Sequence, residues 1–253
     1  MSDKPPKVTP VNPDKGVYVF ASGRKGSGKS VICRSWFDAY PYDRIVIDVT
    51  HDLHDDLKRD GVEFEELKDG DMLPARLPAS KRGQPDYKPK TWVYRPDGGA
   101  KTAIDDMDRV VGLGINRGPT LIWIDEFGEI STGNRTPPNV RRILHHGRHS
   151  QITLLLACPR PMDIDPLAIS QADLVYTFRT AVPDDRDRVA KNIGWDPADF
   201  SRINAQLAAP PYGKYWHTKY DQGADELWIM PPLPQRRRGQ RPIGDAEDYA
   251  HSA

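Results

Sequence analysis

The sequence has few cysteines, no long apolar run and no net charge, and each absence excludes a class of protein. Cys33 and Cys158 are the only cysteines in 253 residues, which excludes a disulfide framework and favours a reducing compartment. No apolar run approaches the roughly 20 residues that span a bilayer, and the N-terminal segment lacks the apolar stretch of a signal peptide. We therefore expect a soluble intracellular protein without a membrane span.

The net charge of the chain gives no reason to expect a polyanionic partner. Acidic and basic residues number 36 each, so the formal net charge is zero. A surface for nucleic acid must then come from a local excess of basic residues. Hydrophobic residues make up 38% of the chain, which is enough for the core of one α/β domain of ordinary size.

The 24 prolines help to place the boundaries of that domain. Residues 1–15 combine prolines with charges and are typical of a flexible N-terminal arm. We expect the folded domain at 16–230, with a proline-rich surface insertion at about 71–98. Residues 231–253 are rich in arginine and proline and predict an extended C-terminal tail.

Apolar runs alternate with helical patterns along the domain. The expected strands are Val17–Ala21, Arg44–Val49, Thr91–Tyr94, Thr120–Ile124, Ile152–Ala157 and Asp173–Phe178. The expected helices are Lys29–Tyr40, Asp52–Arg59, Ala103–Leu113, Val140–His149 and Asp185–Ile193. Continuous rather than alternating apolar strands indicate an α/β fold, with a central mostly parallel sheet and helices on both faces. Lys214–His217 and Glu226–Ile229 predict a C-terminal hairpin.

A glycine-rich turn between the first strand and the first helix carries the strongest motif. Gly23-Arg24-Lys25-Gly26-Ser27-Gly28-Lys29-Ser30 fits the P-loop pattern G-x-x-x-x-G-K-[ST]. Its glycines allow backbone N–H groups to point at phosphate oxygens, and the helix adds its positive end. Lys29 supplies charge to the β- and γ-phosphates, and Ser30 offers a hydroxyl to Mg²⁺. The expected ATP-binding set is Gly23, Arg24, Lys25, Gly26, Ser27, Gly28, Lys29, Ser30 and Val31.

Two carboxylates end the apolar strand Thr120–Ile124. Asp125 is expected to hold the shell of the magnesium ion together with Ser30. Glu126 is expected to polarise the attacking water as a general base, and this second acid favours an additional-strand hydrolase over a small-molecule kinase. Solvated acids at an ordinary strand end are the alternative, which the upstream P-loop disfavours. Glu129 fits a surface residue better.

Together these motifs resemble the FtsK–HerA superfamily of DNA-pumping ATPases. The resemblance extends over roughly residues 16–195 and includes Gly147-Arg148-His149 before a strand that runs into Arg160-Pro161. The Arg-His pair is similar to the viral genome-packaging branch. The resemblance implies a RecA-like additional-strand P-loop NTPase, a homo-oligomeric ring, pentameric or hexameric, with ATP at subunit interfaces, and non-specific movement of double-stranded DNA.

The chain departs from the family pattern at the end of the fourth strand. The family carries a Gln or Asn there that senses the γ-phosphate, whereas this chain has Cys158-Pro159. Proline cannot supply that side chain. Either a neighbour such as Arg160 takes the role, or the sensing is weak.

Ring ATPases also use an arginine from the next subunit to stabilise charge on the transferring phosphoryl group. The candidates are Arg148, which is the first choice and the expected catalytic arginine, Arg179 and Arg186. The predicted basic helix carries Arg141, Arg142, His145, His146, Arg148 and His149. A second cluster, His51, His54, Asp55 and Asp56, is interpreted as the loop after the second strand rather than as a metal site.

Two basic segments are candidates for contact with DNA phosphates. Lys81, Arg82, Lys88 and Lys90 in the proline-rich insertion either line a pore or form a solvated loop. The tail residues Arg236, Arg237, Arg238 and Arg241 either bind DNA or accompany a partner that binds Pro231-Pro232-Leu233-Pro234.

The sequence thus predicts an ATPase motor that packages double-stranded DNA into a viral capsid, in the cytoplasm of a host cell, with a capsid portal or vertex protein as a further partner. Two alternatives stay open. One is an assembly or secretion ATPase similar to the Zot-like proteins of filamentous phage, and the other is a nucleotide-binding module without motor activity.

Overall fold

The computed structural model describes residues 15–74, 78, 84, 86–97, 102–133, 135–147 and 149–233. The predicted N-terminal arm, apart from residue 15, and the tail from residue 234 onward lie outside these ranges. The candidate residues that also lie outside them are Lys81, Arg82, Arg148, Arg236, Arg237, Arg238 and Arg241.

The described residues form one nine-stranded sheet, in the order β3-β4-β2-β5-β6-β1-β7-β8-β9. The strands are β1 Tyr18–Ser22, β2 Asp43–Ile47, β3 Glu65–Leu67, β4 Thr91–Tyr94, β5 Thr120–Ile124, β6 Ile152–Cys158, β7 Leu174–Phe178, β8 His217–Asp221 and β9 Glu226–Met230. β1 to β7 are parallel to one another, β8 is antiparallel to β7, and β8 and β9 form an antiparallel hairpin that completes the sheet. The mostly parallel sheet and the C-terminal hairpin are therefore confirmed.

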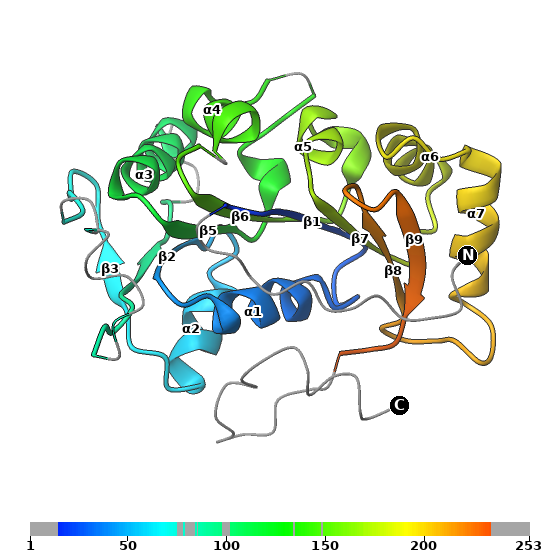
Figure 1. The fold of residues 1–253 in the computed structure, drawn as a ribbon, viewed down its shortest axis with the longest axis horizontal. Helices are drawn as coiled ribbons and strands as arrows, with labels where there is room; N and C mark the ends of the chain where they lie inside the picture. Colours follow the sequence, from blue (N-terminus) through cyan, green and yellow to red (C-terminus); the bar gives the residue numbers. More distant parts are fainter. Residues whose placement is uncertain are drawn as a thin grey trace.

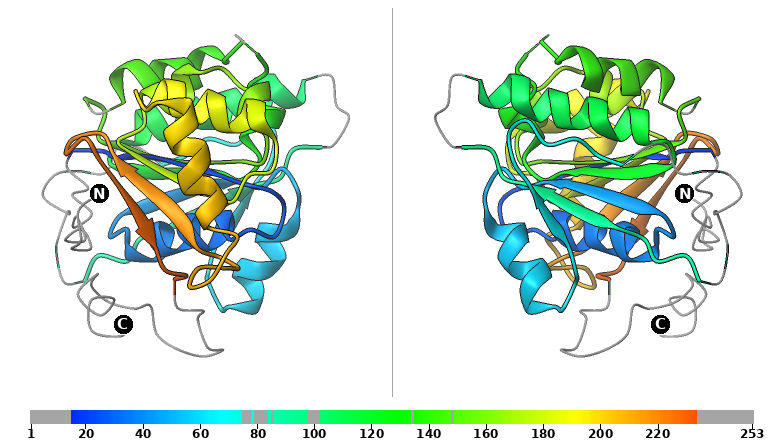
Figure 2. Two further views of the ribbon diagram at one scale, coloured as in Figure 1. Left: turned by 90° about the vertical axis from the view of Figure 1, so that its right-hand side faces the viewer. Right: turned by 90° about the vertical axis from the view of Figure 1, so that its left-hand side faces the viewer.

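Seven α-helices accompany the described strands: α1 Lys29–Ala39, α2 Asp52–Arg59, α3 Ala103–Arg117, α4 Pro138–His146, α5 Leu167–Ser170, α6 Pro183–Asn192 and α7 Pro197–Gln206. α1 and α2 cover one face of the sheet, and α3, α4 and α5 cover the other (Figure 1). The side views show the β8–β9 hairpin and α7 next to each other at one end of the sheet (Figure 2). No helix among these residues is long and apolar enough to cross a bilayer.

Alternate residues of each strand pack into two separate cores, as the period of a strand requires. Tyr18 and Phe20 of β1 belong to the core beneath α3 and α4, whereas Val19 and Ala21 belong to the core against α1. Both sets are buried. This two-sided burial explains why the strands are continuous apolar runs.

The order of the central strands decides the subclass of the fold. β6 lies between β1, which leads into the P-loop, and β5, which ends at Asp125. An additional strand between these two elements is the arrangement expected for the additional-strand class. The second acid after β5 predicted that class correctly.

Several predicted elements differ from the structure, among them the helix that begins at Ala103, which ends at Arg117 rather than at Leu113. The basic helix begins at Pro138 and ends at His146, because the amide of Ile152 bonds the Gly147 carbonyl at 3.0 Å and turns the chain into β6. The first hairpin strand begins at His217 rather than Lys214, because Tyr215 has φ 70° and cannot continue an extended strand. β4, expected within a surface insertion, is a buried inner strand.

Short elements escaped the sequence analysis. β3 has three residues and α5 has four, too few to show a periodic pattern. α7 is longer and carries a recognisable start, because the Asp196 carboxylate accepts hydrogen bonds from the amides of Ala198 and Asp199 at 2.9 and 3.0 Å. Asp before Pro197 is a known start signal, and it was available in the sequence.

Candidate nucleotide-binding site

The P-loop connects β1 to α1 at the carboxyl edge of the sheet. Gly23 has φ 146° and Gly28 has φ 115°, conformations that side chains rarely adopt. Neighbouring atoms also leave no room for a side chain at either position. A Cβ atom on Gly23 would lie 2.7 Å from Phe178 Cβ, and one on Gly28 would lie 2.9 Å from Phe178 Cε1. Both glycines are therefore required for the loop to pass beneath the end of β7.

Lys29 is buried at the first position of α1, with its ammonium group turned back into the loop. Its Nζ donates to the carbonyl oxygens of Gly23 at 2.8 Å and of Arg24 at 3.3 Å. Burial lowers the pKa of Lys29, while the charges of Glu126 and Asp125 act to raise it. The cation thus lies within the electrostatic reach of both predicted carboxylates.

The loop also presents donors that lack a partner. The amides of Gly28, Lys29 and Ser30 have no acceptor within the described part of the chain, as expected at a helix N-terminus. The hydroxyl of Ser27 is buried and likewise has no partner among these residues. Convergent amides beside a buried ammonium fit a polyphosphate.

A hydroxyl and a carboxylate meet beside this cradle. Ser30 Oγ donates to Asp125 Oδ1 at 3.3 Å, although 95 residues separate them in the chain. Burial raises the pKa of Asp125, against which the Ser30 hydrogen bond acts. A buried carboxylate next to a hydroxyl fits Mg²⁺, which takes hard oxygen ligands and keeps several waters. The sequence predicted both residues.

Thr50 is a third member of this group that the sequence analysis missed. Its Oγ1 donates to the other oxygen of Asp125, Oδ2, at 3.4 Å. Thr50 follows the strand β2, which pairs with β5, so the two strand ends meet at the same edge. The rule that singled out Asp125, a polar residue after an apolar strand, also applies to Thr50.

Glu126 directly follows Asp125 and is half-buried. Burial raises the pKa of its carboxyl group, and the nearby Lys29 ammonium lowers it. A glutamate with a raised pKa is a better proton acceptor than a solvated one, because catalytic efficiency grows as the pKa approaches the working pH. Glu129, predicted as a surface residue, is exposed.

The sensor position at the end of β6 holds a neutral thiol. Cys158 is buried, and burial raises the pKa of its thiol to about 12. Its backbone carbonyl accepts a hydrogen bond from the Gly23 amide at 3.3 Å, so this strand end lies against the P-loop. Two residues further on, Arg160 Nε is 3.2 Å from Asp185 Oδ2, and 54% of the arginine side chain is exposed. A cation two residues after the sensor position is therefore held by an ion pair with Asp185.

The other candidate arginines occupy different environments. Arg148 lies outside the described residues. Arg186 donates to Ser201 Oγ at 2.9 Å and to the carbonyls of Thr180 and Ala181 at 3.0 and 2.8 Å, all within its own chain. Arg179 is exposed immediately after β7. Of the predicted basic helix, the residues described as exposed are Arg141, Arg142, His145, His146 and His149, the last of which lies beyond the end of α4.

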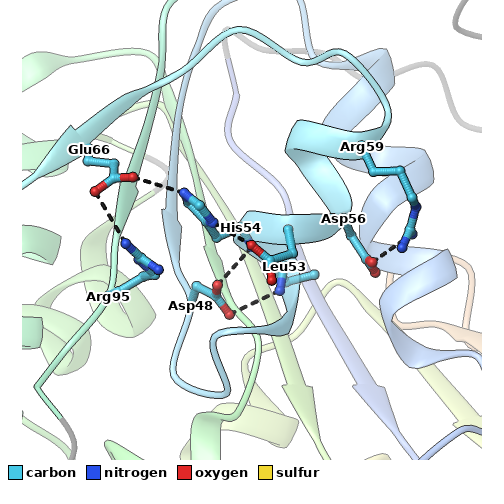
Figure 3. Close-up of polar contacts among 8 residues, drawn as sticks. Asp48, Leu53, His54, Asp56, Arg59, Glu66 and Arg95 are labelled. Carbon is cyan, nitrogen blue, oxygen red and sulfur yellow. Dashed lines mark hydrogen bonds and ion pairs between the residues drawn. The ribbon is translucent and has the colours of Figure 1, made fainter.

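The histidine cluster after β2 has a structural role (Figure 3). The Asp48 carboxylate accepts the amides of Leu53 and His54 at 3.2 and 2.8 Å, which caps α2. The His54 ring bridges Asp55 and Glu66, each at 2.9 Å, and thereby ties α2 to β3. Within the described ranges no group of three or more His, Cys, Asp or Glu residues is arranged to hold a metal ion.

Comparison with known proteins shows what this chain is similar to in sequence and in fold. No protein-family model matches the chain. The DNA packaging ATPase P9 of Enterobacteria phage PRD1 is 28% identical over 154 residues, which cover 58% of this chain and 62% of the relative. The chain is a homologue of that packaging ATPase. It spans less than two thirds of the length of this relative.

Solved structures share the fold. The genome packaging NTPase B204 from Sulfolobus turreted icosahedral virus 2 matches with a TM-score of 0.63 in its complex with ATP-gammaS, at 21% sequence identity. The same protein in complex with AMPPCP matches with a TM-score of 0.62 at 22% identity. Both matches cover 88% of this chain and 100% of the matched chain. This chain thus has the same fold as these two packaging NTPase structures.

Proposed function

We propose that this protein is an ATPase motor that packages double-stranded DNA into a viral capsid. The observation that carries the proposal is the meeting of the P-loop with the acids of β5. Lys29 is buried among loop carbonyls, and Ser30 bonds Asp125. The similar proteins are a phage DNA packaging ATPase and a viral genome packaging NTPase whose structures are complexes with AMPPCP and ATP-gammaS.

Each site residue has a role in this proposal. The P-loop residues from Gly23 to Val31 bind ATP, and Lys29 neutralises charge on the β- and γ-phosphates. Ser30 and Asp125 would hold Mg²⁺, and the hydrogen bond from Thr50 would orient the Asp125 carboxylate. The metal would supply charge to the transferring phosphoryl group. Glu126 takes the proton of the attacking water.

The motor requires more than one subunit. A homo-oligomeric ring, pentameric or hexameric, would place an arginine from the next subunit at each site. Arg148 and Arg179 are the candidates for this arginine. Arg186 is not, because its guanidinium group already donates three hydrogen bonds within its own chain. The exposed arginines of α4, Arg141 and Arg142, offer positive charge to DNA phosphates, and three exposed histidines lie on the same segment.

The test is ATP hydrolysis with and without double-stranded DNA. Wild type is expected to hydrolyse ATP faster when DNA is present. Glu126→Gln should bind ATP and lose roughly 10²- to 10⁴-fold in rate, since it lacks the base. Lys29→Ala should lose ATP binding. As a control, Glu129→Gln removes an exposed carboxylate three residues from the proposed base and should hydrolyse ATP like wild type.

Two results would contradict the proposal. The first is hydrolysis by Glu126→Gln at the wild-type rate, which would remove the base from the mechanism. The second is a wild-type rate that DNA leaves unchanged at every protein concentration, which would favour a nucleotide-binding module over a motor.

A further inference from the structure

The loop before β8 brings an aromatic ring to the P-loop. A Cβ atom on Gly28 would lie 3.5 Å from Tyr215 Cδ1, so the ring of Tyr215 lies against the N-terminus of α1. Tyr215 is half-buried, and the Lys214 Nζ lies over its ring, 4.7 Å from the centroid. This contact joins the last part of the sheet to the phosphate cradle, although 187 positions separate Gly28 from Tyr215 in the numbering.

Tyr215 has an unfavourable backbone conformation. Its φ of 70° lies in the left-handed region, which costs of order 1 kcal/mol for a residue that is not glycine. The Tyr215 carbonyl accepts a hydrogen bond from His217 Nδ1 at 3.2 Å. His217 is buried between the rings of Tyr176 and Phe178, 5.8 and 5.0 Å away. The histidine thus fixes the strained residue, and such strain concentrates at ligand sites.

A second apolar group lies in the first turn of α1. Val31 is 42% exposed in the first turn of α1, one of few large hydrophobic side chains so exposed among the described residues. Val31 is three positions after Gly28, the left-handed residue that precedes α1. The N-terminal end of α1 therefore has an exposed valine in its first turn and an aromatic ring against its N-cap.

The geometry points to Tyr215 as the residue that stacks on the nucleobase of the bound nucleotide, with Val31 contacting the same base. This inference rests on the proposed ATPase function and extends it to a nucleobase subsite. The phosphates occupy the cradle at the start of α1, so the base must lie outside it. A flat heterocycle with two π-faces is the chemical class that fits an aromatic ring and an aliphatic side chain.

Equilibrium binding separates base contacts from phosphate contacts. The ligands are AMPPCP, which has an adenine base, and inorganic tripolyphosphate, which has none, each with Mg²⁺ and measured by calorimetry. Tyr215→Ala is expected to weaken AMPPCP roughly ten- to a hundredfold, as the loss of one stacking ring does, and to leave tripolyphosphate unchanged. Tyr215→Phe keeps the ring and should bind both ligands like wild type.

Tyr212→Ala is the matched control, because it also removes a half-buried ring from this loop. Tyr212 packs on Trp216 at 4.9 Å between ring centroids and should leave both affinities unchanged. Equal weakening of AMPPCP and tripolyphosphate by Tyr215→Ala would overturn the inference, as would unchanged or tighter AMPPCP binding. Wild type that binds tripolyphosphate and AMPPCP equally would overturn the subsite alone, whereas wild type that binds neither would contradict the ATPase function itself.

Discussion

Arg160 is the candidate for the phosphate sensor that the end of β6 lacks. Cys158 and Pro159 offer no side-chain amide to a γ-phosphate, and the buried thiol stays neutral because its pKa is raised to about 12. The Asp185 carboxylate, 1% exposed, holds Arg160 by its Nε and also accepts the Met162 amide at 3.0 Å. The Arg160 side chain remains 54% exposed, and it follows β6 at the edge of the sheet where the P-loop lies.

Replacement of Arg160 should therefore slow hydrolysis without weakening nucleotide binding. Arg160→Ala is expected to lower the rate roughly 100-fold, the loss that follows removal of one donor to a transition state, with the affinity for AMPPCP kept. Arg188→Ala is the control, since Arg188 donates to the Met162 carbonyl at 3.3 Å in the same turn. Steady-state rates and calorimetry measure the two effects. Wild-type hydrolysis by Arg160→Ala would mean that no cation senses the phosphate there.

At this scale the sequence predicts residues whose chemistry has a fixed spacing. Lys29 and Ser30 follow from the P-loop pattern, and Asp125 follows from its place after an apolar strand. Tyr215 does not, because its role arises from a contact with Gly28 across 187 positions. No local pattern encodes such a contact, and only the order of the strands brings these residues together.

Among the elements, the β8–β9 hairpin contributes more than an edge to the sheet. β8 pairs with β7, whose last residue, Phe178, packs on Gly23 and Gly28. His217 at the start of β8 contacts Phe178 and holds Tyr215. The hairpin therefore supports the P-loop from the side opposite to β6. The sequence indicated a hairpin, but it placed the first strand three residues early because a left-handed residue cannot be read from composition.

The buried His217 makes the stability of the protein depend on pH. Burial lowers its pKa from 6.5 to about 4, so between these values the unfolded chain binds a proton that the folded chain does not. The free energy of unfolding therefore falls as the pH drops through this window, by about 3 kcal/mol at most. His217→Gln removes this contribution, so the difference in stability between wild type and variant should change between pH 7 and pH 4.5.

Urea denaturation at a series of pH values measures this difference. His145→Gln is the control, because His145 is exposed on α4, and its curve should run parallel to that of wild type. If the curve of His217→Gln also ran parallel to wild type throughout the window, His217 would not be the buried neutral group described here.

At the scale of the whole molecule, all parallel strands end at one edge, and the candidate site residues lie after four of them. The P-loop follows β1, Thr50 follows β2, Asp125 follows β5 and Arg160 follows β6. The sequence predicted the additional-strand class from the second acid after β5, but it did not predict the order of the strands in the sheet. The number of subunits and the path of DNA depend on surfaces between chains, which one chain's sequence does not specify.

The claim that ATP hydrolysis moves DNA is tested most directly by displacement of a triplex-forming strand from a linear duplex. We expect wild type with ATP and Mg²⁺ to release the third strand, and we expect no release with AMPPCP or with Glu126→Gln. A wild-type protein that hydrolyses ATP faster on DNA and yet leaves the third strand in place would contradict the motor account, and would show that hydrolysis serves some step other than translocation.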